Sequence, residues 1–241
     1  MIKLINRQDY TERITPFIDK NIIKVLTGQR RVGKSCILRQ IQEHIEHTHS
    51  NCNTICINKE LEEFAFIRTN EELTAYVTEH LKEGCANYLF IDEVQDINGF
   101  EHTLRSLQAQ DACDIFITGS NATMLSSELS TYLSGRYIEF HIHSLSYKEF
   151  MEFNRLTPST QTLRNFLTFG GLPYLSNLPL QRDIVFEYLR NVYSTIMLKD
   201  VVRRENIRNV DFRKHSHYIQ LTTWAIFSQP TISAVISSRS A

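Results

Sequence analysis

The sequence has almost no net charge and no long apolar segment, and both absences narrow the classes of protein that it can encode. Lys and Arg together number 26 and Asp and Glu 27, for a formal net charge of -1. Such a balance gives no global attraction to nucleic acid or to an anionic membrane, although it is compatible with a local basic patch. No apolar run approaches the roughly 20 residues that a membrane span requires.

The chain also lacks the features of a secreted protein. Its first seven residues, MIKLINR, do not contain the long apolar stretch of a signal peptide. The five cysteines are an odd number and lie scattered, which favours reduced thiols over a disulfide framework. With 42% hydrophobic and 22% charged residues, the composition is that of an ordinary globular protein, and we expect a cytoplasmic one.

Two kinds of segment alternate through residues 1–145, and their alternation predicts an α/β fold with a mostly parallel sheet and helices on both faces. The β-rich runs are residues 22–26, 54–57, 88–91, 115–117 and 137–142. Helices are expected at 34–48, from a cap at Asn70 to about 82, and at 98–110. In the first of these, Ile37, Leu38, Ile41 and Ile45 form one face, and Gln40, Glu43, His44 and Glu46 face away. Residues 146–209 are predicted to be helical, with a turn at Gly170-Gly171-Leu172-Pro173.

Residues 28–35, GQRRVGKS, match the phosphate-binding pattern G-x-x-x-x-G-K-[ST] between a strand and an amphipathic helix. Glycines let the backbone wrap closely around phosphate, and the helix N-terminus adds partial positive charge. We expect Lys34 to reach the β- and γ-phosphates and the Ser35 hydroxyl to bind Mg²⁺. The residues expected to hold the nucleotide are Gly28, Gln29, Arg30, Arg31, Val32, Gly33, Lys34, Ser35 and Cys36.

Two further strands are predicted to bring polar side chains to the same edge of the sheet. The run YLFIDE ends in Asp92, which suits holding Mg²⁺ through water, and Glu93, which suits polarising a water for attack on the γ-phosphate. Strand 115–117 leads into Thr118-Gly119-Ser120-Asn121. Asn121 is the first choice, and Ser120 the second, for a side chain that contacts γ-phosphate and water; a plain helix cap at Asn121 is the alternative.

These motifs, together with LSGRY at 133–137, LSYKEF at 145–150 and GGLP at 170–173, resemble those of the prokaryotic AAA-type ATPases whose P-loop domain precedes a C-terminal domain of unknown function. The resemblance covers about residues 1–212. It implies ATP with Mg²⁺, and a sheet in which strand 115–117 lies between the P-loop and Asp-Glu strands. It places Arg136 where an arginine neutralises γ-phosphate charge, in cis or toward a neighbouring subunit, with a structural ion pair as an equal alternative.

The last part of the chain loses its pattern. Residues 213–241 contain no Asp, Glu or Gly and no clean helical or strand period. One plausible back-translation, read out of frame, resembles the start of that family's C-terminal domain. We therefore hypothesise a frameshift just after Phe212, and expect three segments: an ATPase domain at 1–145, a helical segment at 146–212 and an anomalous tail.

The sequence thus predicts an ATP-binding and ATP-hydrolysing α/β domain with Glu93, Asn121 and Arg136 as catalytic residues and Ser35 and Asp92 at Mg²⁺. A nucleotide-dependent switch with little hydrolysis, or a DNA-associated ATPase with its basic residues at Lys199, Arg203, Arg204 and Arg208, are the alternatives. We expect a protein or nucleic-acid partner, which the sequence does not identify, and no membrane partner. A homo-oligomer is possible as well. The pairs Cys52/Cys56 and His47/His49 lack the spacing of a zinc site.

Overall fold

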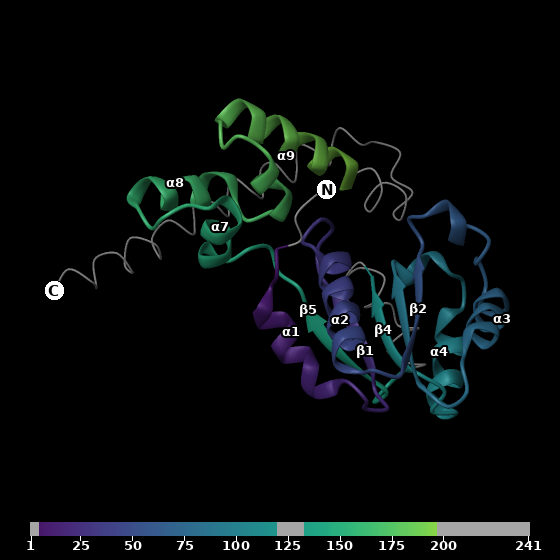
Figure 1. The fold of residues 1–241 in the computed structure, drawn as a ribbon. Coiled ribbons are helices and arrows are strands. Elements are labelled where there is room, and N and C mark those ends of the chain that lie inside the picture. Colours follow the sequence, from purple (N-terminus) through teal and green to yellow (C-terminus); the bar gives the residue numbers. More distant parts are fainter. Residues whose placement is uncertain (1–4, 120–132, 197–241) are drawn as a thin grey trace. The chain divides into compact units, whose positions relative to one another are not determined.

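The computed structural model describes residues 5–119 and 133–196, and these ranges contain a five-stranded parallel sheet with helices on both faces (Figure 1). The strands are β1 (Ile23–Thr27), β2 (Cys52–Asn58), β3 (Ala86–Asp92), β4 (Asp114–Thr118) and β5 (Tyr137–His141), in the order β2-β3-β4-β1-β5. Every neighbouring pair is parallel. The predicted α/β class is confirmed, and so is the position of β4 between β1 and β3.

The chain divides into two compact units, Met1–Val185 and Phe186–Ala241. The whole sheet belongs to the first unit, and the boundary falls within α9 (Arg182–Ile196), whose second part is what the structure describes of the other unit. No helix among the described residues is long and apolar enough to cross a membrane. The segment boundaries at 145 and 212 stay predictions, and the tail 213–241 lies outside the described residues.

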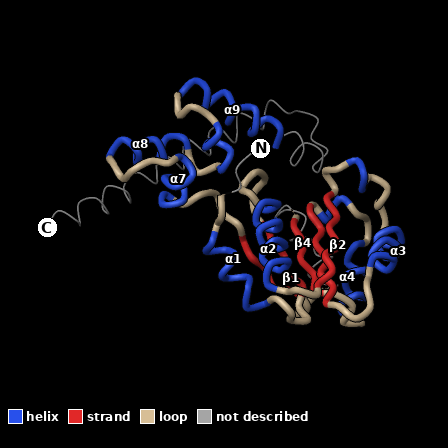
Figure 2. The backbone as a smooth tube through the Cα atoms, viewed as in Figure 1, coloured by secondary structure: helices blue, strands red, loops and turns tan. Residues whose placement is uncertain are grey.

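Helices cover the strands of the sheet on both faces (Figure 2). Successive residues of a strand point to opposite faces, so that a single strand contributes to two cores. Val25 and Ile91 point into the core that includes α3 (Asn70–His80) and α4 (Phe100–Ala109). Leu26 and Phe90 point into the core that includes α1 (Gln8–Ile14) and α2 (Lys34–Thr48). Burial on both faces explains why these strands read as unbroken apolar runs.

Helix α2 has the predicted bounds and buries the predicted face, but one residue departs from the prediction. Gln40 was expected to face away from the core, and it is buried with 8% of its surface exposed. Its side-chain amide donates to the Ile5 carbonyl oxygen at 2.9 Å and its Oε1 accepts from the Arg7 backbone N–H at 3.3 Å. Gln40 lies beside the apolar face of α2 and is buried because it hydrogen-bonds to the segment that holds Ile5 and Arg7. The periodicity of the helix does not predict such a contact.

The start of α3 also corrects the prediction. Thr69, not Asn70, is the N-cap: its side chain accepts a hydrogen bond from the Glu72 N–H, and the Glu72 carboxylate accepts one from the Thr69 N–H. This reciprocal pair is a capping box, which satisfies two otherwise unpartnered N–H groups. Asn70 is the first helical residue, and its carbonyl oxygen accepts from the Thr103 hydroxyl of α4 at 2.9 Å.

After β5 the chain is helical as far as the structure describes it, as predicted. The helices are α7 (Tyr147–Asn154), α8 (Thr160–Phe169) and α9, with the 3-10 turn η4 (Pro173–Asn177) between the last two. Serines cap both α7 and α8: Ser146 forms a capping box with Glu149, and Ser159 accepts from the Thr162 N–H at 3.0 Å. The other short elements are η1 (Thr15–Phe17), η2 (Glu62–Phe64) and η3 (Val94–Asp96).

A buried ion pair lies at the start of the two central strands. Lys24 of β1 is fully buried, and its ammonium donates to the Asp114 carboxylate of β4 and to the Lys20 carbonyl oxygen. Burial lowers the pKa of Lys24 and raises that of Asp114, while the attraction between the two charges opposes both shifts. Each charge is therefore tolerated only because the other is present.

Replacing one member of this pair is expected to destabilise the fold strongly. Asp114→Asn should lower the free energy of unfolding by about 3–5 kcal/mol, because it leaves a buried ammonium without its counter-charge. The matched control is Asp111→Asn at an exposed site, which should change it by less than about 0.5 kcal/mol. Urea unfolding followed by circular dichroism measures both, and equal effects in the two variants would contradict the role given to the pair.

Candidate functional site

The segment between β1 and α2 forms a tight loop whose first residue has no room for a side chain. Gly28 has φ +140°, and a Cβ added there would lie 2.2 Å from the carbonyl oxygen of Ile142. Gly33, with φ +99°, immediately precedes α2. Both positive φ values fall where residues with a side chain are strained. The two glycines of the phosphate-binding pattern are thus required by geometry.

Lys34 extends back into this loop instead of out to solvent. Only 4% of its surface is exposed, and its ammonium donates to the carbonyl oxygens of Gly28 at 3.1 Å and Gln29 at 3.2 Å. The positive charge lies next to the N-terminus of α2, which carries partial positive charge of its own. Two sources of positive potential in one loop make it suited to an anion of high charge density.

The other loop residues differ in exposure. Gln29, Arg31, Ser35 and Cys36 are exposed, Arg30 is half-buried, and Gly28 and Val32 are buried. The Cys36 thiol is next to Ser35; burial raises its pKa, with a further contribution from the Asp92 charge against the opposing charge of Arg39. Although Cys36 is exposed as a residue, the raised pKa keeps its thiol protonated at neutral pH, and a protonated thiol is a poor nucleophile.

Two carboxylates stand at the end of β3, Asp92 as its last residue and Glu93 directly after it, and a threonine of the neighbouring strand connects them. Asp92 and Glu93 keep only 5% and 9% of their surfaces exposed. The Thr118 hydroxyl, at the end of β4, donates to Asp92 Oδ1 and accepts from the Glu93 N–H at 3.0 Å. Sequence analysis quoted Thr118 within a motif but assigned it no role, because its hydroxyl is recognisable as a bridge only once β4 lies beside β3.

Glu93 itself has an uncommon backbone. Its φ is +56° and ψ +51°, the left-handed helical region, which is rare for residues other than glycine. Its side chain accepts a hydrogen bond from the Gln95 amide. The Thr118 and Gln95 bonds hold the Glu93 backbone and carboxylate in place.

The ends of β1, β4 and β3 lie side by side at one edge of the sheet. Because β4 lies between β1 and β3, the axes of β1 and β3 are two strand spacings apart, which is about 10 Å. Asp92 ends β3 at the same edge of the sheet at which the loop after β1 leads into α2. The structure therefore brings together the predicted loop residues and the acidic pair.

Two further residues were predicted to be catalytic, Asn121 and Arg136. Asn121, with the second choice Ser120, lies outside the described residues. Arg136 precedes β5, and its carbonyl oxygen accepts from the Ile23 N–H at the start of β1. The loop that begins at Gly28 follows the other end of β1, so Arg136 lies at the opposite edge of the sheet. The proposed role of Arg136, in cis or toward a neighbouring subunit, stays a prediction.

The turn at residues 170–173 lies next to the loop. The Gly171 carbonyl oxygen accepts from the Leu145 N–H at 2.7 Å, and Pro173 Cγ is 3.9 Å from where a Cβ on Gly33 would stand. The turn predicted at Gly170-Gly171-Leu172-Pro173 is therefore held by Leu145 and places Pro173 close to Gly33, the last residue of the loop.

Comparisons with known proteins agree with this geometry. A family model described as an AAA domain matches residues 20–151. An uncharacterized protein of Haemophilus influenzae is 30% identical over 219 residues, and one of Methanocaldococcus jannaschii is 32% identical over 222. These alignments cover 88% and 86% of this chain but only 54% and 47% of the relatives. The chain thus spans about half the length of the curated relatives that it matches.

A solved structure supports the fold alone. Cdc6p from Pyrobaculum aerophilum superposes with a TM-score of 0.50 at 13% sequence identity, covering 82% of this chain and 64% of that one.

The close approach at Gly28 predicts a large cost for adding one methyl group. Gly28→Ala should destabilise the protein by more than about 3 kcal/mol, because the new Cβ adds a backbone collision to the cost of positive φ. Gly84→Ala is the matched control: it has φ +77° with nothing within 4 Å of the added Cβ, and should cost only about 1 kcal/mol. Thermal and urea unfolding of the two variants measure the difference, which should vanish if sterics at Ile142 are unimportant.

Proposed function

The chain belongs to the AAA domain family, and from this premise we propose that it binds ATP together with Mg²⁺ and hydrolyses the ATP. One observation supports this most directly: the loop that holds Lys34 and the pair Asp92-Glu93 meet at one edge of a parallel sheet. Such an edge is where ligands bind in open α/β sheets. The combination serves both phosphate binding and attack by water.

In the proposed complex, the backbone N–H groups of the loop and the Lys34 ammonium bind the phosphates. Lys34 would exchange its bonds to the loop carbonyl oxygens for phosphate oxygens, which carry more charge. The Ser35 hydroxyl and the Asp92 carboxylate offer the oxygen ligands that Mg²⁺ prefers, directly or through water. When bound, Mg²⁺ supplies neutralisation of phosphate charge.

Glu93 is proposed to orient the attacking water. Its carboxylate is mostly buried, which strengthens its electrostatic effect on a water held beside it. In the described conformation the Gln95 amide donates to Oε2 of that carboxylate, so the water would be oriented by the remaining acceptor positions of Glu93. Asn121 remains the proposed contact to γ-phosphate and water, and Arg136 a proposed contribution to a neighbouring subunit's site.

The bond between Gln95 and Glu93 also favours a second candidate function, a nucleotide-dependent switch with little hydrolysis. A carboxylate whose charge is shared with the Gln95 amide is a weaker base toward water, and in this second candidate nucleotide binding would act by stabilising one conformation. The two candidates share the phosphate site and differ in turnover. Measured turnover of bound ATP separates them.

The test compares three variants. Glu93→Gln should lower ATP turnover by about a hundredfold or more while Mg·ATP still binds, because the amide cannot accept a proton. Lys34→Ala should lose ATP binding. Glu79→Gln, at an exposed position of α3, should leave both unchanged. Phosphate release measures turnover and isothermal titration calorimetry measures binding.

The outcomes are separable. Unchanged turnover in Glu93→Gln would refute the water-orienting role. Wild-type protein that binds ATP without turnover would support the switch, and unchanged ATP binding in Lys34→Ala would refute the phosphate site itself.

A further inference from the structure

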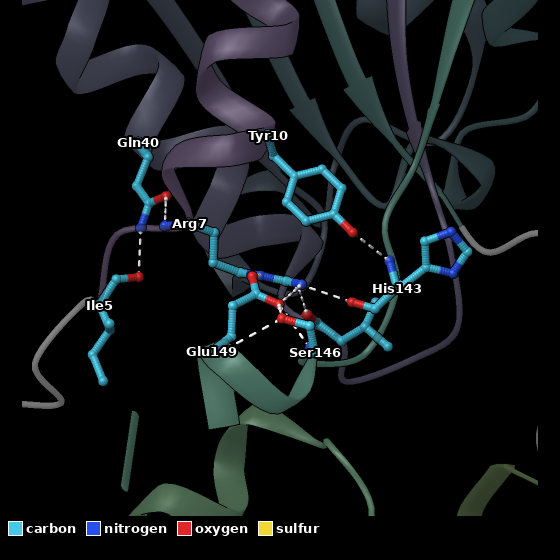
Figure 3. A network of polar contacts seen from close by, with 8 residues as sticks. Ile5, Arg7, Tyr10, Gln40, His143, Ser146 and Glu149 are labelled. Carbon is cyan, nitrogen blue, oxygen red and sulfur yellow. Dashed lines mark hydrogen bonds and ion pairs between the residues drawn. The ribbon is translucent and has the colours of Figure 1, made fainter. Parts of the chain in front are cut away.

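Arg7 is a buried arginine outside the phosphate loop, at a position where sequence analysis recognised nothing. Only 4% of its surface is exposed. A guanidinium does not lose its charge in a protein, so burying it requires hydrogen-bond acceptors for its five N–H groups. Its acceptors come from two parts of the chain that are far apart in the sequence, Val32 in the phosphate loop and the stretch that holds His143 and Glu149 (Figure 3).

The first acceptor is in the phosphate loop. Arg7 Nη1 donates to the carbonyl oxygen of Val32 at 3.1 Å, in a buried contact. The Val32–Gly33 peptide bond is trans and planar, so the Gly33 N–H lies in the same plane as that carbonyl group and points in the opposite direction from its oxygen. Arg7 therefore fixes the direction of an N–H group in the turn that leads into α2. In a loop that binds anions through backbone N–H groups, this direction determines how well phosphate is held.

The other acceptors are in the part of the chain that follows β5, the last strand of the sheet. The same Nη1 donates to the carbonyl oxygen of His143 at 2.9 Å, while Nε and Nη2 donate to the two carboxylate oxygens of Glu149 at 2.7 and 3.2 Å. Glu149 lies in the first turn of α7 and also receives the Ser146 N–H. Burial tends to raise the pKa of Glu149, but the bonds from Arg7 and Ser146 outweigh it and lower the pKa, so the carboxylate is charged at neutral pH.

Neighbouring groups leave the guanidinium little freedom. Its carbon lies 4.5 Å from the centre of the Tyr10 ring, in a cation–π contact, and the Tyr10 hydroxyl accepts from the His143 N–H at 3.0 Å. Gln40 holds the Arg7 backbone N–H. A fork bound on one side to a carboxylate and on the other to two carbonyl oxygens cannot shift at one partner without loosening another.

We propose that Arg7 is a positioning residue for phosphate binding, which sets the Val32–Gly33 peptide of the phosphate loop and couples it to α7 through Glu149. The inference rests on the proposed function, since it presupposes that the loop binds phosphate. Arg7 does not touch the nucleotide in this proposal. If Glu149 moved, Arg7 would move with it and change the orientation of the Val32–Gly33 peptide. Conversely, an anion bound in the loop would favour the arrangement in which Arg7 is hydrogen-bonded to both Val32 and Glu149.

The test measures Mg·ADP affinity by isothermal titration calorimetry at a temperature where circular dichroism shows each variant folded. Arg7→Lys keeps the charge but loses the planar fork, so it cannot serve Val32, His143 and Glu149 together. We expect it to bind Mg·ADP about tenfold more weakly than wild type. Arg13→Lys is the matched control, because Arg13 is exposed on the same helix α1 and its guanidinium carbon lies 5.9 Å from the centre of the same Tyr10 ring.

Glu149→Gln supplies a second, milder variant, for which we expect a loss of affinity of about threefold. The double variant should bind no more weakly than Arg7→Lys alone, because Glu149 acts on the loop through Arg7. A purely structural Arg7 would lower the melting temperature but leave affinity unchanged below the transition.

Wild-type affinity in Arg7→Lys and Glu149→Gln, with binding lost in Lys34→Ala, would overturn the inference and leave the proposed function standing. Unchanged binding in Lys34→Ala would overturn the proposed function, and the inference with it. If Arg7→Lys does not fold, Glu149→Gln decides: weaker binding supports the coupling, and wild-type affinity excludes it.

Discussion

Parallel alignment of the strands is the constraint on which the rest of the molecule depends. When every strand runs in the same direction, whatever follows a strand lies at one edge of the sheet and whatever precedes a strand lies at the other. The loop after β1, the carboxylates after β3 and Thr118 at the end of β4 therefore share an edge. The same rule puts Arg136, which precedes β5, at the opposite edge, and the ion pair of Lys24 with Asp114 lies at the starts of their strands.

The conformation of the phosphate loop does not come from its eight residues alone. Gly28 packs against the Ile142 carbonyl oxygen, Gly33 lies next to Pro173, and the Val32 carbonyl oxygen accepts from Arg7. All three supports come from outside the loop motif, and two of them from the chain after β5. A short Gly-rich segment is conformationally free by itself, so contacts of this kind provide the order that the free chain lacks.

Features of the fold that depend on residues close together in the sequence were predicted well, and features that depend on distant residues were not. The bounds of α2 and the unbroken strands followed from periodicity and from the apolar runs of a sheet covered on both faces. The cap of α3 was misplaced by one residue, because Thr69 and Asn70 are both good caps and only the bonds to Glu72 distinguish them. Gln40 and Arg7 were missed because polar residues are buried through partners distant in the sequence. The position of Arg136 at the start of β5 could not be related to the phosphate loop until β5 was known to pair in parallel with β1.

The sequence separation between Arg7 and its partner Glu149 has a consequence for folding during synthesis on the ribosome. Arg7 is 25 residues from Val32 but 142 residues from Glu149. On a ribosome that adds about 5–20 residues per second, the carboxylate appears on the order of ten seconds after the guanidinium, when most of the sheet has already been synthesised. During that interval the arginine must stay in water, since burying it without its carboxylate is unfavourable. The segment around Arg7 would then dock only after the start of α7 has been synthesised, although it is made well before the sheet.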